Sequence, residues 1–143
     1  MESLNFSQDS SIDKLCKQLM AEVKRTYSEK QKLSDDLLSS LHFVFQGPLL
    51  SALELVDKSS VSHVISPSGR DLYQVIGASG KPYTCLPNLK YCSCPAYTFS
   101  VLRKEDHIMC KHVLAIQLSV AMGLCKVIQV SDTEICNMIR DID

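Results

Sequence analysis

Three cysteines and one histidine lie within 21 residues of this chain, and they constrain its fold more than any other feature. Cys92, Cys94, Cys110 and His112 have the spacing C-x-C-x15-C-x-H. Thiolate and imidazole are ligands that zinc prefers, and three cysteines with one histidine are a standard closed tetrahedral set. The spacing therefore predicts that these four residues bind one structural Zn²⁺ ion.

The two halves of the pattern require different local structures. C-x-C is tighter than the usual C-x2-C, so both sulfurs reach one ion only at a strand end or sharp turn where Ser93 points away. C-x-H suits the start of a helix, because the free N–H groups of the first turn can donate to a thiolate. The 15 intervening residues are enough to leave a strand, form a short helix and a loop, and return.

Other readings of the cysteines and histidines follow from their surroundings. Buried free cysteines pack as small hydrophobic residues, and this is the simpler alternative for the quartet. We prefer this core interpretation for the remaining cysteines, Cys16, Cys85, Cys125 and Cys136. Cys16 lies on an apolar helical stripe, and alternation within "YTCL" makes Cys85 a strand residue. His107 is a rival ligand to His112, but it lies in a charged segment.

The first 60 residues have a helical pattern. Apolar residues recur at three- and four-residue steps from 11 to 27, which is typical of an amphipathic helix. "YSEKQK" is predicted to be a polar connection. Ser34 precedes acidic residues, as a helix start prefers, and Pro48 occupies the first position of a further helix. The sequence therefore predicts helices over 11–27, 35–46 and 48–60.

A β-rich pattern follows the helices. Short β-branched and aromatic runs separated by "PSG" and "ASG" predict a three-stranded antiparallel meander over 61–66, 70–77 and 81–87. Residues 88–95 add a strand or a tight turn, 96–102 a short helix, and 103–108 a charged loop. An apolar helix over 111–123 is stopped by Gly123. "SDTE" at Ser131 is a capping-box signature before a short C-terminal helix.

The order of these elements predicts an α+β fold: N-terminal helices, an antiparallel meander, then a zinc-binding module with a C-terminal helix. We divide the chain into three parts. They are a helical region over 1–60, β-hairpins plus the zinc module over 61–126, and a short C-terminal helix or tail over 127–143.

Composition limits the class of protein. Apolar residues make up 45% of the 143 residues, which is enough for a core, and no window approaches 18 uninterrupted apolar residues. We therefore expect no membrane span. The N-terminus "MESLNFSQDSSID" has no secretion signal, so seven cysteines indicate thiols or metal ligands in the cytosol or nucleus. The net charge of −1 argues against nucleic-acid binding by bulk electrostatics, although residues 81–126 carry six Lys or Arg against two acids.

Two enzymatic readings fit poorly. Cys110 and His112 are a possible nucleophile–base pair, but side chains two apart on a helix do not face each other. A zinc ion with four protein ligands also has no open position for substrate or water. "GASGKP" is not a phosphate-binding loop, because Val75 stands where the first glycine is needed and Pro82 follows Lys81. We expect a protein that is not an enzyme.

The C-x-C…C-x-H pattern resembles that of SWIM zinc fingers, in which C-x-C lies near a β-hairpin and C-x-H at a helix start. The similarity extends beyond the ligands and is dense from Ser51 to Ser119. Several segments strongly resemble those of the small SWIM-domain proteins of the animal Shu complex. The segments that carry it are "SPSGR", "YQVIG", "YTCL", "YCSCPAY", "FSVLRK" and "CKH" followed by "LA".

This resemblance implies a nuclear, non-enzymatic partner in homologous recombination. Such proteins pair with a RecA-like recombinase paralogue and promote or stabilise recombinase filaments on single-stranded DNA. The apolar residues of the three N-terminal helices exceed what a small zinc module can bury, which predicts a partner-binding face within residues 11–56. The alternative is a stand-alone nucleic-acid-binding zinc finger. A thiol enzyme is a third reading.

The basic residues near the predicted zinc site have two equally supported interpretations. Arg103, Lys104 and Lys111 flank the predicted zinc site and are candidates for phosphate contacts. Equally, these charges balance Glu105, Asp106 and the negative zinc–thiolate centre. We expect single-stranded DNA to be bound through the complex.

Overall fold

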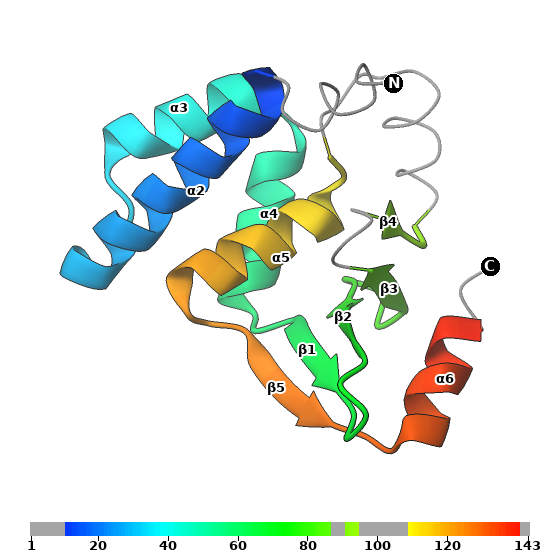
Figure 1. Cartoon of the computed structure of the whole chain (residues 1–143). Helices are drawn as coiled ribbons and strands as arrows, with labels where there is room; N and C mark the ends of the chain where they lie inside the picture. Colours follow the sequence, from blue (N-terminus) through cyan, green and yellow to red (C-terminus); the bar gives the residue numbers. More distant parts are fainter. Residues whose placement is uncertain (1–10, 87–90, 95–108, 141–143) are drawn as a thin grey trace, which may run out of the picture.

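The computed structural model describes residues 11–86, 91–94 and 109–140. In this part of the chain, three helices are followed by a sheet, a central helix, one more strand and a last helix (Figure 1). The helices are α2 (Ser11–Lys30), α3 (Asp35–Phe45), α4 (Pro48–Asp57), α5 (Lys111–Met122) and α6 (Asp132–Arg140). This arrangement confirms the predicted α+β class. None of these helices is long and apolar enough to cross a membrane.

Helix α2 follows the predicted apolar stripe but is longer than predicted. Cys16, Leu19 and Val23 are buried on one face, as their three- and four-residue spacing requires. The prediction of a polar connection from residue 27 was wrong, because the helix continues to Lys30. Arg25 forms ion pairs with Glu22 and Glu29 at helical spacing. Such pairs favour helix where no apolar periodicity remains.

Helices α3 and α4 begin where their sequence signals predict. The Ser34 Oγ accepts a hydrogen bond of 3.2 Å from the Leu37 N–H and caps α3. Pro48 occupies the first turn of α4, where its missing N–H costs nothing. Both helices point leucines inward, and Leu41 and Leu49 are almost completely buried.

The described strands form a five-stranded sheet in the order β4-β3-β2-β1-β5. The strands are β1 (Val61–Ile65), β2 (Asp71–Ile76), β3 (Pro82–Leu86), β4 (Tyr91–Cys92) and β5 (Lys126–Gln129). Strands β1 to β3 form the predicted antiparallel meander, and β4 extends it. Strand β5 was not predicted. It pairs in parallel with β1, which makes the sheet mixed.

Helix α5 is the centre of the core. Seven of its twelve residues are buried, and it contacts α2, α4 and strands β1 to β4. Leu114 and Leu118 are completely buried within the cluster that joins the helices to one face of the sheet. Gly123 ends the helix as predicted and adopts a left-handed conformation. The chain then leads directly into β5.

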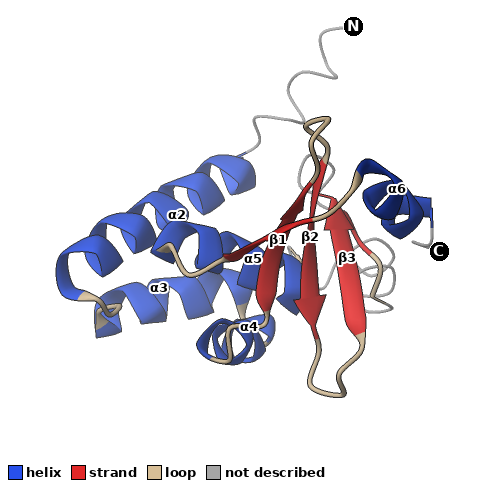
Figure 2. Ribbon diagram, turned by 90° about the horizontal axis from the view of Figure 1, so that it is seen from below, coloured by secondary structure: helices blue, strands red, loops and turns tan. Residues whose placement is uncertain are grey.

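Helix α6 covers the opposite face of the sheet (Figure 2). Its Ile135 is completely buried against Val64 and Leu72 in a second, smaller cluster. The predicted cap is present, because the Ser131 Oγ accepts a hydrogen bond of 3.0 Å from the Glu134 N–H. The helix thereby closes the side of the sheet that α5 does not reach.

Two further predicted elements, the short helix over 96–102 and the charged loop over 103–108, lie outside the described residues.

Gly123 and Gly47 provide a matched test of this architecture. A Cβ would meet no atom within 4 Å at either position, but Gly123 has a φ of +71° and Gly47 lies in the right-handed helical region. We expect Gly123→Ala to lower the free energy of unfolding by about 1 kcal/mol, because only its backbone conformation is unfavourable for alanine.

Chemical denaturation of the zinc-loaded protein measures this difference. Gly47→Ala is the control and should leave stability unchanged or slightly raised. Equal losses in both variants would contradict the assignment of the α5 cap.

Candidate metal centre

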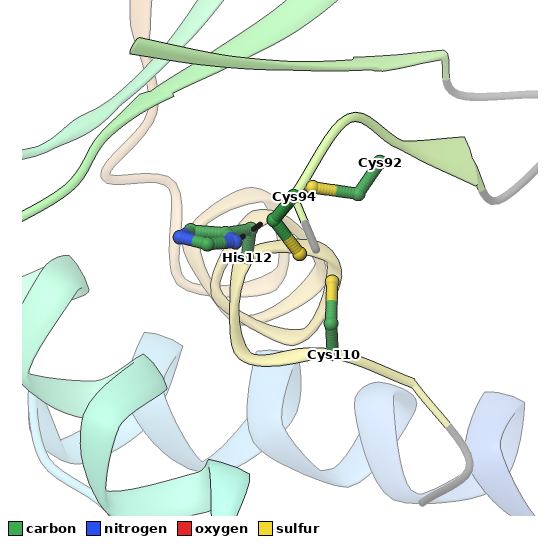
Figure 3. Close-up of side chains that lie close together, drawn as sticks. All are labelled: Cys92, Cys94, Cys110 and His112. Carbon is green, nitrogen blue, oxygen red and sulfur yellow. Dashed lines mark hydrogen bonds between the residues drawn. The ribbon is translucent and has the colours of Figure 1, made fainter. Parts of the chain in front are cut away.

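The structure brings all four predicted ligands together at one point. One donor atom from each of Cys92, Cys94, Cys110 and His112 lies within 4.8 Å of the others. All four side chains are buried, with exposed fractions of 1 to 3%. Figure 3 shows the three sulfurs and the imidazole converging between the end of β4 and the start of α5. Residues at either end of the C-x-C-x15-C-x-H pattern therefore build one site.

The sheet side of the site depends on a tight turn after β4. Cys92 pairs with Cys85 of β3, and the ladder continues through a hydrogen bond of 3.0 Å from the Ser93 N–H to the Thr84 carbonyl. The Ser93 Oγ accepts a second hydrogen bond, of 3.1 Å, from the Thr84 N–H. Ser93 is thus turned toward β3, as the C-x-C spacing requires. Cys92 and Cys94 are free to point to the same place.

The helix side uses Cys110 as the N-cap of α5. Cys110 has extended backbone angles, φ −76° and ψ 167°, so it precedes the helix rather than belonging to it. Its Sγ turns back and accepts a hydrogen bond of 3.5 Å from the Val113 N–H. Two residues that are two apart within a helix would diverge. The N-cap geometry removes this difficulty and lets Cys110 and His112 converge.

The distances fit a tetrahedral zinc ion. Zn–S bonds of about 2.3 Å and Zn–N bonds of about 2.0 Å place sulfur and nitrogen about 3.5 Å apart, and two sulfurs about 3.8 Å apart. The Cys92 Sγ and the His112 Nδ1 lie 3.7 Å apart. The donor atoms lie at most 4.8 Å from one another, so they would need to move closer by about 1 Å or less to bind the ion. The four residues therefore form a site able to hold one zinc ion.

The contacts among the buried thiols affect their pKa values. The pKa of the Cys110 thiol is raised, first by contact with Cys92, then by contact with Cys94 and by burial. For Cys92, contact with Cys110 lowers the pKa, but contacts with Cys85 and Cys94 and burial raise it more. Three buried thiolates cannot be ionised together without positive charge between them. Zinc supplies that charge and binds them as thiolates.

Stacking on Tyr83 holds the imidazole of His112. The two ring centroids are 4.3 Å apart, with an angle of 29° between the planes. The His112 Nδ1 faces the sulfurs, and the His112 Nε2 is buried without a hydrogen-bond partner among the described residues. Metal-bound histidines are usually oriented by a hydrogen bond from the second nitrogen. Here the face of Tyr83 positions the ring instead.

Because Gly77 has no side chain, it leaves room for the ring of Tyr83. A Cβ at Gly77 would lie 3.0 Å from the Tyr83 Cε2 atom. Tyr83 is not among the site residues predicted from the sequence. The alternation of "PYTCL" could have suggested it, because Tyr83 and Cys85 fall on one face of β3, beside the predicted site.

The remaining sequence candidates divide into three groups. Cys85 is buried beside Cys92 but is not in the ligand group, and Cys16 is buried on α2. Lys111 is exposed between two ligands, at the start of α5. The other two candidate DNA contacts, Arg103 and Lys104, lie outside the described residues, as does His107.

Comparison with known proteins agrees with this geometry. The family model of the SWIM zinc finger matches residues 76–120, which include all four cluster residues. The chain is 50% identical to Zinc finger SWIM domain-containing protein 7 of Danio rerio, over 91% of this chain and 93% of the relative. It is 46% identical to the protein of that name from Homo sapiens, over 85% and 87% of the two chains.

The protein of the same name from Mus musculus is 44% identical, over 92% of this chain and 86% of the relative. No solved structure gives a significant match.

Loss of one ligand should unfold the module rather than weaken it slightly. Structural zinc contributes about 10–16 kcal/mol of apparent binding free energy, which is as large as the whole net stability of about 5–15 kcal/mol of a typical domain. We expect Cys94→Ser to lose bound zinc and cooperative melting. Zinc content by mass spectrometry and melting by circular dichroism measure both effects.

Cys85→Ala is the matched control, because Cys85 is equally buried and adjacent to the site. It should keep one zinc ion per chain. Full zinc content in Cys94→Ser would show that the sulfur of Cys94 is not a ligand.

Tyr83 should affect zinc binding through the orientation of His112. We expect Tyr83→Ala to weaken zinc binding about 10-fold or more, as loss of an orienting neighbour typically does. Tyr83→Phe keeps the ring and should bind zinc like the original chain. Competition with a chromophoric chelator measures the affinities. Equal affinity in the alanine and phenylalanine variants would remove the positioning role.

Proposed function

Because this chain belongs to the family of zinc finger SWIM domain-containing protein 7, we propose that it is a non-enzymatic, zinc-stabilised adaptor in homologous recombination. It pairs with a RecA-like recombinase paralogue in the nucleus. The pair promotes or stabilises recombinase filaments on single-stranded DNA.

The closed metal centre is the observation that carries the proposal. Cys92, Cys94, Cys110 and His112 offer four protein ligands, and all are buried. A zinc ion held by four protein ligands has no open position for substrate or water, which is the arrangement of structural sites. The centre therefore supports a role in folding and presentation of a surface rather than in catalysis.

The glycine-rich segment "GASGKP" also supports an adaptor. It forms a hairpin turn between β2 and β3, closed by a hydrogen bond of 2.9 Å from the Gly80 N–H to the Gly77 carbonyl. A phosphate-binding loop needs a helix after its lysine, and β3 follows instead. In the proposed complex, ATP binding belongs to the RecA-like partner.

The recombination role rests on the resemblance of residues 51–119 to the small SWIM-domain proteins of the Shu complex. Contact with DNA through Arg103, Lys104 and Lys111 is part of the same proposal. Lys111 supports it by its exposure beside the zinc site. Phosphate contacts of this kind would make the affinity of the complex for single-stranded DNA fall with salt.

Native mass spectrometry of the protein purified gently from its own cells tests the proposal, because one spectrum reports metal and partner together. We expect a mass increment of one zinc ion on this chain within a complex that contains a second chain of RecA-like sequence.

Two other outcomes would contradict the proposal. A zinc-loaded chain found alone, with salt-sensitive binding to single-stranded DNA, would favour a stand-alone zinc finger. A folded chain without metal would return the four residues to the thiol or core interpretations.

A further inference from the structure

An apolar groove of about 460 Å³ lies between α2, α5 and the sheet. Helices α2 and α5 lie side by side (Figure 1). Met20 of α2, Ile116 and Val120 of α5 and Tyr73 of β2 are among its walls. This volume is within the range of about 300–1,000 Å³ that ligand pockets occupy. Val120 is 51% exposed, so the groove opens to solvent along α5.

Two lysines give the groove a positive rim. Lys17 and Lys24 line it from α2, and no aspartate or glutamate is among its described lining residues. Within the part of the chain that the structure describes, neither lysine forms an ion pair, although Arg25 on the same helix does. An apolar groove with two unneutralised lysines complements an occupant that is apolar and acidic.

The floor of the groove continues across the sheet. Tyr73 stacks on His63 of β1, with ring centroids 4.5 Å apart. His63 pairs in register with Val127 of β5, and Tyr73 pairs with Cys85 of β3. These four residues form one row across four strands, on the face that α5 covers at Val61. Val127 is 63% exposed, so the row leaves the groove and reaches solvent.

We propose that this groove is the docking site for an amphipathic helix of the partner chain, with acidic residues facing Lys17 and Lys24. The partner is the RecA-like recombinase paralogue of the proposed function, and this inference rests on that function. The helix lies beside α5 across the row from Cys85 to Val127. It completes the helical layer that α5 begins on this face of the sheet.

The spacing of the lysines favours a helix over other occupants. Lys17 and Lys24 are seven residues apart on α2, which corresponds to about 10 Å along a helix axis. Acidic residues two turns apart on a second helix have the same spacing. Apolar residues at i, i+3, i+4 and i+7 would then fill the groove, as in other helix-in-groove complexes.

The open edge of β5 is a weaker candidate for the same partner. Its four residues extend over only about 13 Å, so an added strand would make few hydrogen bonds. Pairing of two β5 strands from two copies of this chain would be equally short. Both alternatives leave the apolar groove and the two lysines without an occupant, and the experiment distinguishes them.

Affinity measurements on the zinc-loaded full chain and the RecA-like paralogue test the inference. Val120→Glu places a charge in the groove at a half-exposed position, where it should not disturb folding. We expect it to weaken binding about 100-fold, and the double variant Lys17→Glu/Lys24→Glu to weaken it about 10-fold. Zinc content should stay at one ion per chain in both variants.

Matched controls lie away from the groove. Ile139→Glu introduces the same charge at an exposed apolar residue of α6, which packs on the opposite face of the sheet. Lys30→Glu/Lys32→Glu makes the same change in net charge as the double groove variant, and neither residue lines the groove. Both controls should bind the partner like the original chain.

The outcomes separate the inference from the proposed function. Binding of the groove variants that equals the controls would overturn the inference while leaving the adaptor role intact. Failure of the original chain to bind the paralogue would remove the adaptor role and the inference together. In hydrogen exchange of the complex, protection at residues 17–24 and 113–121 supports the groove. Protection confined to residues 126–129 would assign the partner to the β5 edge instead.

Discussion

The convergence of β4 and α5 on one buried metal site is the constraint on which the rest of the structure depends. Contacts with Cys92 and Cys94, together with burial, raise the pKa of the Cys110 thiol, so the three sulfurs would be ionised together only around a cation. The cation then connects two segments that are separated by 15 residues of sequence. It fixes the first turn of α5 against the edge of the sheet.

Helix α5 connects the metal site to the rest of the core. Its N-cap and first turn hold Cys110 and His112, its middle residues Leu114 and Leu118 are completely buried, and its end at Gly123 leads to β5. Both α2 and α4 pack on it. A zinc ion bound at the first turn of α5 would therefore also affect the position of the helices that pack on it.

The sequence predicted the site better than it predicted the sheet. The convergence of the four ligands follows from local geometry: a turn after β4 and an N-cap at Cys110. Helix starts were predictable for the same reason, because Ser34, Pro48 and Ser131 act on their immediate neighbours. Strand β5 could not be predicted. Its residues are all exposed, and within the described part of the chain its strand partner is β1, about 60 residues earlier.

The groove belongs to the same class of non-local features. Its walls come from α2, α5 and two strands, and no single segment carries its signature. Val113 and Ile116 line it, and they follow directly the metal-binding first turn that contains His112. A partner helix in the groove would contact the helix that the metal orients. Thermodynamic linkage would then be reciprocal: any factor by which zinc strengthens binding of the proposed partner is the factor by which the partner strengthens zinc binding. If the partner helix binds as proposed, the two sites would be coupled, because both would need α5 in one position.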